Sequence, residues 1–269
     1  YIVPPALGER SGLLGALASG YFLREHPFPL GYTLCLGATF VCLLISYAAM
    51  AAAREPAVKT ARHRLDTRSH LERLPRILQA NPSYAWYLVA RALTVSGMMA
   101  VAFYTVHALR SLGAEEWNVA GFTFALQSAQ AGGGIALGLL ADCAGHRISL
   151  MLGAVAAACA NILALSAADL ALYHGVFLLL GLSLASTTVS SLTFVLELAE
   201  GEERPTYVGL ATTAQGPFAL AGPPVAALLA AWQGLGAVFA TAGLMSLVAA
   251  LIYLVKVEEP RGKKQDGQD

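Results

Sequence analysis

The sequence is poor in charge. Only 13% of its 269 residues are Asp, Glu, Lys or Arg, whereas 57% are hydrophobic, and the mean hydropathy is +0.60. A soluble domain of this size needs more polar surface, so this balance excludes an ordinary soluble protein and indicates a chain that crosses a membrane several times. The net charge is zero, so any argument about partners depends on where the charges lie along the chain.

The chain also lacks the residue spacings of metal, redox and catalytic sites. The cysteines are scattered, and three of the four lie in apolar runs, where cysteine acts as a small hydrophobe: Cys35, Cys42, Cys143 and Cys159. No glycine-rich nucleotide loop and no catalytic triad is present, and no carboxylate lies deep in an apolar run. These absences argue against an enzyme, and the sequence predicts neither a cofactor nor a metal.

Long apolar runs are what the chain has in abundance. A transmembrane helix needs about 20 apolar residues to cross a hydrocarbon core of about 30 Å. Seven runs pass this test: Leu30–Ala53, Tyr84–Leu109, Val119–Ala141, Ile148–Ala168, Leu170–Leu198, Tyr207–Trp232 and Leu235–Val257. An eighth, Ser11–Leu23, reaches only about 20 Å at 1.5 Å per residue and spans only if the bilayer thins. We therefore expect about eight helices in an all-α, polytopic membrane protein.

The basic residues predict the orientation of these helices, because Lys and Arg near helix ends are retained on the cytoplasmic side. With eight spans, 14 of the 17 basic residues fall on one side: Arg10, Arg54, Lys59, Arg62, Arg64, Arg68, Arg73, Arg76, Arg147, Arg204, Lys256, Arg261, Lys263 and Lys264. Arg24 and Arg110 fall on the other side, and Arg91 lies within a span. The bias predicts that both termini of this chain are cytoplasmic. Acids interleave with the bases of the loop 54–83, so a solvated linker is expected there and nucleic-acid binding is not.

Two pairs of short segments indicate an internal repeat. "GERSGLLG" (Gly8–Gly15) echoes "EERPTYVGL" (Glu202–Leu210), and "REP" (Arg54–Pro56) echoes "EEP" (Glu258–Pro260). Each pair brackets two apolar runs, so the first two helices would be equivalent to the last two. If the second repeat unit has six helices, the first unit should also have six, of which this chain holds the last two.

The turn "GLLADCAGHR" at 138–147 carries a specific resemblance. Together with the six-helix repeat and the basic central loop, it resembles the cytoplasmic signature of the major facilitator superfamily of transporters. Four positions match Gly-x-x-x-Asp-x-x-Gly-x-Arg: Gly138, Asp142, Gly145 and Arg147. Cys143 departs from the pattern, because a basic residue usually follows the aspartate in the family.

The resemblance implies helices five to twelve of a twelve-helix transporter, with the N-terminal part truncated. The expected domains are 1–56, the last two helices of the N-terminal half; 57–83, a cytoplasmic central loop; 84–257, the C-terminal six-helix half; and 258–269, a cytoplasmic tail. In the family, the aspartate of the turn interacts with the positive end of a neighbouring helix and stabilises one side of an alternating-access cycle. For Asp142 that neighbour would begin near Thr206. The alternative is a short loop that is polar because it faces water.

Polar residues within the spans are candidates for a substrate cavity, since they are costly in lipid and usually face a bundle interior. Gln127 and Gln130 are three residues apart on one helix face, and they are expected either to bond a substrate or to bond a neighbouring helix. Arg91 is expected to snorkel to the cytoplasmic interface or, as the alternative, to meet an anionic substrate. Among the hydroxyl residues of 183–191, which include Thr187, most are expected to bond their own helix carbonyls.

One more helix carries both a cavity candidate and a run of prolines. Gln215 precedes "GPFALAGPP", in which Pro217, Pro223 and Pro224 should kink or break the helix and suit a moving gate.

The sequence thus predicts a monomeric permease in a bacterial inner membrane. It would move a small solute, alone or together with protons or other ions, by secondary active or facilitative transport with alternating access. The alternative is a truncated remnant that inserts into the bilayer and scaffolds or binds without transporting. Four further helices ahead of Tyr1 would distinguish the two.

Overall fold

The computed structural model describes residues 29–52, 77–79, 81–199 and 203–259. By their contacts these fall into two compact units, 1–65 and 66–269, which are described separately. Every regular element in the described residues is helical. The predicted all-α, multi-pass fold is therefore confirmed.

The first unit contributes one described helix, α2 (Leu30–Ala52). Its 23 residues rise about 35 Å, which is long enough to cross a bilayer. The prediction of a span at Leu30–Ala53 is confirmed to within one residue. The weaker candidate, Ser11–Leu23, lies outside the described residues.

The second unit contributes six spans in the described part of the chain. The first is assembled from α4 (Pro82–Gly97), the short 3₁₀ helix η1 (Met98–Ala100) and α5 (Val101–Ser111). The others are α6 (Glu116–Ala144), α7 (His146–Ser166), α8 (Leu170–Leu198), α9 (Arg204–Gln233) and α10 (Leu235–Val255). All six predicted runs of this unit are found, with ends that differ by only a few residues.

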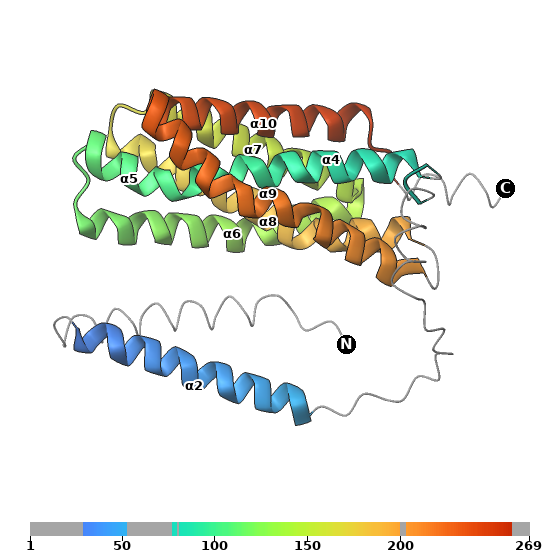
Figure 1. Cartoon of the computed structure of the whole chain (residues 1–269), viewed down its shortest axis with the longest axis horizontal. Coiled ribbons are helices and arrows are strands. Elements are labelled where there is room, and N and C mark those ends of the chain that lie inside the picture. Colours follow the sequence, from blue (N-terminus) through green and yellow to red (C-terminus); the bar gives the residue numbers. More distant parts are fainter. Residues whose placement is uncertain (1–28, 53–76, 80, 200–202, 260–269) are drawn as a thin grey trace. The chain divides into compact units, whose positions relative to one another are not determined.

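The six spans alternate in direction along the bundle (Figure 1). The α6–α7 turn, the start of α4, the start of α9 and the end of α10 therefore lie at one end. The α5–α6, α7–α8 and α9–α10 connections lie at the other. The alternation agrees with the loop assignment made from the basic residues.

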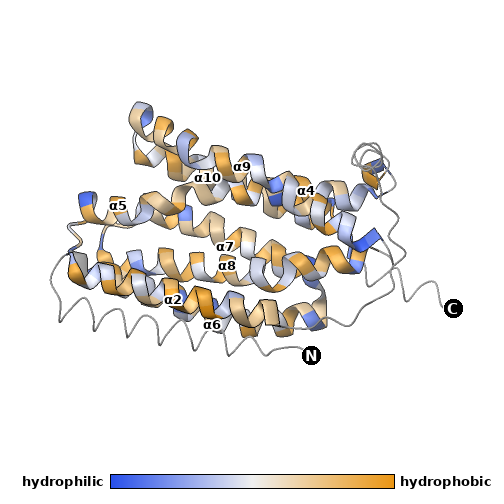
Figure 2. Ribbon diagram, turned by 60° about the horizontal axis from the view of Figure 1, so that its bottom comes forward, coloured by the Kyte–Doolittle hydropathy of each residue, from blue (hydrophilic) through white to orange (hydrophobic). Residues whose placement is uncertain are grey.

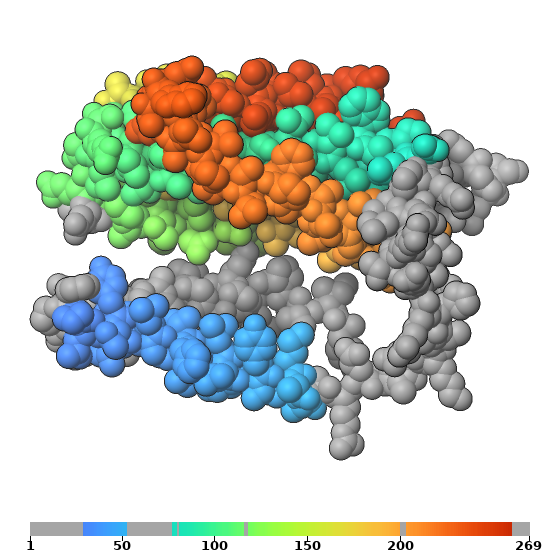
Figure 3. Space-filling model, viewed as in Figure 1, coloured from blue at the N-terminus to red at the C-terminus, as the bar shows by residue number. Residues whose placement is uncertain are grey.

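Large apolar side chains remain on the outside of this unit, as expected of surfaces that face lipid. Leu220 is 81% exposed and Trp232 is 80% exposed, both on α9. Figure 2 shows apolar residues along most of the length of the helices. Figure 3 shows α9 crossing one face of the unit obliquely beside α4.

Small residues allow the helices to approach closely, which is how helices pack in lipid without a hydrophobic driving force between them. Gly181 of α8 leaves no room for a side chain, because a Cβ there would meet the backbone of Leu126 and Gln130 on α6. Gly153 of α7 lies in the same way against Ser186 of α8. These contacts fix α8 between α6 and α7.

Two aromatic clusters fill the interior, one towards each end of the bundle. The cluster near the α6–α7 turn contains Tyr84, Tyr87, Phe194, Tyr207 and Tyr253. The cluster at the other end contains Tyr104, Phe122, Tyr173, Phe177 and Phe239. Tyrosine hydroxyls in both bond backbone carbonyls of neighbouring helices, as Tyr84 does to Tyr207 at 2.6 Å and Tyr173 to Tyr104 at 2.9 Å.

The prolines of α9 do not break it. The helix runs without interruption from Arg204 to Gln233 through Pro217, Pro223 and Pro224. A proline within a helix removes one backbone donor and crowds the preceding turn, but the helix hydrogen bonds on either side can hold the segment together. Of the two expected outcomes, a kink or a break, the break is excluded and the kink stays a prediction. The sequence did not predict the interruption that the structure does show, the 3₁₀ turn Met98–Ala100 in the α4–α5 span.

Candidate functional site

Arg91 is the most unusual side chain inside the bundle. It lies about 14 Å along the helix axis from Pro82. Among the described Asp, Glu, Lys and Arg residues, it alone lies more than two turns from both ends of its span. An arginine at such depth is costly and marks a functional path more often than a packing site.

The guanidinium of Arg91 is held between helices. Its Nη1 donates a hydrogen bond to Thr187 Oγ1 of α8 at 3.2 Å. Its Nε is buried and has no hydrogen-bond partner. In the described part of the chain, no carboxylate oxygen lies within 4.0 Å of its guanidinium nitrogens, the distance that defines an ion pair. The side chain thus bonds sideways into the bundle, so the expectation that Arg91 snorkels to the interface is wrong.

Tyr87 and Ser191 form a second layer, one helical turn nearer the α6–α7 end. The Tyr87 hydroxyl donates to the Ser191 carbonyl at 3.0 Å. Tyr87 precedes Arg91 by four residues on α4, and Ser191 follows Thr187 by four on α8. Because α4 and α8 are antiparallel, the two contacts are stacked about 6 Å apart along the bundle.

A pocket opens beside this layer, between α4, α8 and α9. Its volume is about 90 Å³, well below the roughly 300–1,000 Å³ of sites for drug-sized ligands, so it has room only for a small solute. Its polar lining residues are Tyr87, Ser191, Thr212 and Gln215, whereas Arg91 and Thr187 lie one turn beyond and do not line it. Its apolar lining residues are Leu192, Val195, Val208 and Ala211. Such a lining suits a small solute with one polar or charged end.

Gln215 reaches about the same depth as Arg91. The contact between Tyr84 of α4 and Tyr207 of α9 sets the register of these parallel helices. Arg91 lies seven residues beyond Tyr84, and Gln215 lies eight beyond Tyr207. Gln215 Nε2 donates to the Ala211 carbonyl at 2.6 Å, which leaves its amide oxygen and second N–H for other partners. Three of the predicted cavity residues, Arg91, Thr187 and Gln215, therefore lie in adjacent helices at similar depth.

The two glutamines of α6 are not part of this group. The side chain of Gln127 is exposed and that of Gln130 is partly buried. Gln130 is on the α6 face that packs against Gly181 of α8. No hydrogen bond of either side chain is recorded, so their role in binding stays a prediction.

The hydroxyl residues of α8 behave differently from the prediction of local back-bonding. Of the six in 183–191, Thr188 bonds its own helix, at the Leu184 carbonyl. Ser186 instead donates to the Ser149 carbonyl of α7 at 2.7 Å, and Thr187 accepts from Arg91. The buried Ser190 hydroxyl has no partner. Back-bonding was the wrong expectation for most of them, because the neighbouring helices come close enough to compete.

The α6–α7 turn is the second place where predicted residues gather. Gly145 adopts φ +95°, a conformation that L side chains rarely take, and a Cβ there would collide with the Glu259 carboxylate. A glycine is therefore required. Gly138 lies about two turns earlier, where a Cβ would just touch Val189 of α8.

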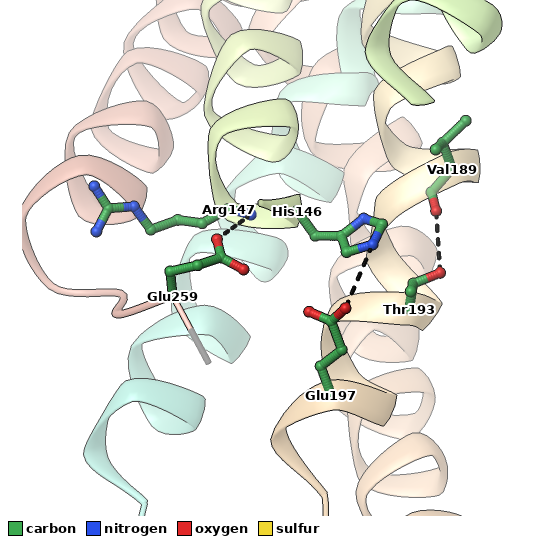
Figure 4. Close-up of polar contacts among 6 residues, drawn as sticks. All are labelled: His146, Arg147, Val189, Thr193, Glu197 and Glu259. Carbon is green, nitrogen blue, oxygen red and sulfur yellow. Dashed lines mark hydrogen bonds and ion pairs between the residues drawn. The ribbon is translucent and has the colours of Figure 1, made fainter. Parts of the chain in front are cut away.

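Arg147 joins this turn to the segment after α10 (Figure 4). Its backbone N–H donates to Glu259 Oε2 at 3.0 Å, the contact drawn in Figure 4. Its Nη1 donates to the Val257 carbonyl at 3.0 Å. A carboxylate at the first turn of α7 is also favoured by the helix dipole. Asp142 is exposed at the end of α6. Its predicted interaction with the start of α9 stays a prediction.

Sequence reasoning missed two partners at this turn. His146 is buried, and its Nε2 lies 3.8 Å from Glu197 Oε1 of α8, a pair that becomes ionic when the imidazole is protonated (Figure 4). Glu259 was noticed only as part of the repeated "EEP". The sequence contained the relevant pattern in both cases. Glu197 and Glu259 each lie near the end of an apolar run, and His146 and Arg147 lie at the turn on the same predicted side of the membrane.

Comparison with protein families decides the assignment. The model of the family described as the Major Facilitator Superfamily matches residues 108–269, which is more than half of the chain. The chain belongs to this superfamily. Comparison with curated proteins finds no match.

Membership gives the protein a general role, the transport of a small solute across a membrane, and confirms the resemblance seen in the turn. The family consists of transporters and not enzymes. In the described residues no group of three or more His, Cys, Asp or Glu is placed to hold a metal ion. The matched region includes the whole α6–α7 turn and α8, α9 and α10.

Proposed function

We propose that this major facilitator protein moves a small solute by alternating access, with the pocket between α4, α8 and α9 as part of its substrate path. One observation supports the proposal: Gln215 lines an open pocket within the membrane-spanning part of the bundle, and the Arg91–Thr187 pair lies one helical turn beyond the pocket-lining residues Tyr87 and Ser191. Polar groups are expensive there, and a transport path is the usual reason for their presence.

Two features support the alternating-access mechanism in particular. The 3₁₀ turn Met98–Ala100 interrupts the α4–α5 span two turns beyond Arg91, and such interruptions are common at hinges. The α6–α7 turn, with Gly145 and Arg147, tethers one end of the bundle to the segment after α10. A hinge in the span that holds Tyr87 and Arg91, and a tether at one end of the bundle, suit a bundle that opens to one side at a time.

We also propose the inner membrane and the predicted orientation, in which the α6–α7 turn faces the cytoplasm. Arg147, Arg204 and Lys256 lie at that end of the described bundle, while Arg110 lies at the other. The protein is proposed to act as a monomer, with a solute moved alone or together with protons or other ions.

The test is solute counterflow in proteoliposomes that contain the whole chain. Radiolabelled butyrate, glucose, alanine and tetraphenylphosphonium represent anionic, neutral, zwitterionic and cationic solutes. Alternating access predicts saturable uptake of at least one of them, accelerated when the same unlabelled solute is trapped inside. Uptake equal to that of protein-free liposomes for all four would overturn the proposal and favour a non-transporting membrane component.

A further inference from the structure

We propose that Arg91 binds the carboxylate of a small monoanionic solute, whose apolar part lies in the neighbouring pocket between α4, α8 and α9. This inference rests on the proposed function and names the class of its substrate. It begins from an imbalance of charge: Arg91 is a permanent cation within the membrane-spanning bundle, and the described residues offer it no carboxylate partner.

The hydrogen bonding of Arg91 is also incomplete. A guanidinium has five N–H donors, and one contact, from Nη1 to Thr187, is recorded. Its buried Nε has no partner. A buried donor on a charged group is costly to leave unsatisfied, so a ligand that accepts two parallel hydrogen bonds would repair the deficit. The planar fork of a carboxylate does this.

The surroundings limit the ligand to one negative charge. One uncompensated cation is present at this depth, and the other polar groups near it are neutral: Thr187, Gln215, Tyr87 and Ser191. A dianion would bring an unpaired charge into the bundle, which is unfavourable in a medium of low polarity. The second N–H of the Gln215 amide remains to bond the carboxylate.

The rest of the pocket determines the shape of the ligand. Leu192, Val195, Val208 and Ala211 form its apolar part. The volume of about 90 Å³ suits a molecule of few heavy atoms. A short aliphatic or aromatic monocarboxylate fits this combination better than a sugar, whose hydroxyls would face apolar side chains.

The experiment measures thermal unfolding of the purified full chain in detergent, because a ligand that binds the folded state raises Tm. The probes are sodium acetate, butyrate and benzoate, each compared with its neutral amide and with equal sodium chloride. At least one carboxylate should raise Tm, while its amide and sodium chloride should not. If no carboxylate exceeds its amide and sodium chloride, the proposal is wrong.

Substitutions test whether Arg91 is responsible for the rise in Tm caused by a carboxylate. Arg91→Gln removes the charge and should weaken carboxylate binding by about tenfold or more, because it loses charge-assisted hydrogen bonds. Arg91→Lys keeps the charge without the planar fork and should bind with intermediate affinity. Arg110→Gln, at the exposed far end of the same span, is the matched control and should respond like the wild type.

A structural role for Arg91 gives a different result. If it only joins α4 to α8, Arg91→Gln should lower the Tm of the ligand-free protein and leave the carboxylate response intact. That outcome would overturn the proposal. Thr187→Val, which removes the same interhelical hydrogen bond and keeps the cation, should retain carboxylate binding.

Failure of this inference is distinguishable from failure of the proposed function. Counterflow of glucose, alanine or tetraphenylphosphonium that Arg91→Gln leaves unchanged would exclude the anion site and support transport. Stabilisation by a carboxylate that Arg91→Gln abolishes, without counterflow of any solute, would support the anion site and exclude transport.

Discussion

Helix α8 has two faces that pack in contrasting ways. Towards α6 and α7, contact is made through small residues: Gly181 lies against the α6 backbone and Ser186 against Gly153. Towards α4 and α9, contact is made through Thr187, which meets the partly buried Arg91, and through Ser191, which meets Tyr87 beside an open pocket. One face is closely packed, and the other is polar and hollow.

The difference between these two faces shows how a helix bundle in lipid can be stable and still have a polar path. Close approach of backbones through small residues supplies packing energy where the hydrophobic effect between helices is absent. The polar face contributes less to packing, and its groups would be costly without a partner or ligand. We infer that the first face fixes the bundle and the second is used for function.

The largest effect is expected on the closely packed face. Gly181→Val should prevent formation of the bundle, because its Cβ would collide with the Leu126 carbonyl of α6, which is backbone and cannot move aside. Size-exclusion chromatography in detergent should show loss of the monodisperse peak. Gly132→Ala on α6 is the control, since its Cβ meets nothing within 4 Å and the protein should stay monodisperse. A monodisperse Gly181→Val protein with unchanged Tm would contradict the comparison.

The polar face should instead respond in binding. Gln215→Leu removes an amide from the pocket and should weaken carboxylate binding by about threefold to tenfold, as expected for loss of one neutral hydrogen bond. Its Tm without ligand should change little. The measurement is the concentration dependence of the Tm shift by butyrate or benzoate. Gln127→Leu on α6 is the matched control, and an equal loss there would place the α6 glutamines in the binding site.

Two buried serines on α8 differ in hydrogen bonding, so substituting each of them measures what an interhelical hydrogen bond contributes to stability. Ser186 and Ser190 are both fully buried, but only Ser186 has a recorded hydrogen bond, to the Ser149 carbonyl. Ser186→Ala should therefore lower the free energy of unfolding by about 1 kcal/mol. Ser190→Ala should leave it unchanged or raise it slightly, because a buried hydroxyl without a partner is removed. Equal destabilisation of the two, measured by thermal or denaturant unfolding in detergent, would refute this distinction.

The smallest effect is expected at the α6–α7 turn. If Asp142 stabilises one side of the cycle, Asp142→Asn should favour the state open at that end by a modest population shift. A cysteine introduced as Leu192→Cys in the pocket, with the four native cysteines replaced by serine, reports the shift through its maleimide labelling rate. We expect the rate to rise about twofold to fivefold. Asp169→Asn, at the opposite end, is the control, and identical rates in the two variants would contradict the role of Asp142.

Most of the fold was predictable because transmembrane spans are local features of the sequence. The run Leu170–Leu198 gave the ends of α8 as the structure has them, since its apolar length alone determines where the chain enters and leaves a bilayer. The α6–α7 turn was predictable for a similar reason, because Gly138, Asp142, Gly145 and Arg147 are spaced within ten residues. The effect of Pro217, Pro223 and Pro224 on α9 was not predictable in the same way. Each proline removes a backbone donor, but whether the helix breaks depends on the surrounding hydrogen bonds, and α9 remains continuous.

The candidate site was only partly predictable. Arg91, Thr187 and Gln215 were each recognised as polar residues inside apolar runs, but nothing in the sequence brings them together. The expectation that Arg91 snorkels failed because it considered one helix alone, whereas Thr187 of a neighbouring helix holds the guanidinium. The glutamines of α6 gave an equally strong pattern, and the structure does not place them beside the pocket.

The sequence by itself determined the all-α class, the positions of the described spans and the glycine at the α6–α7 turn, because apolar length and local backbone geometry depend on neighbouring residues only. The tertiary structure decided which faces of the helices meet. It turned Gly181 towards α6 and Thr187 towards Arg91, and it placed the Glu259 carboxylate at the first turn of α7. The rotation of each helix about its axis depends on how all its neighbours pack, and this information is distributed over the whole bundle.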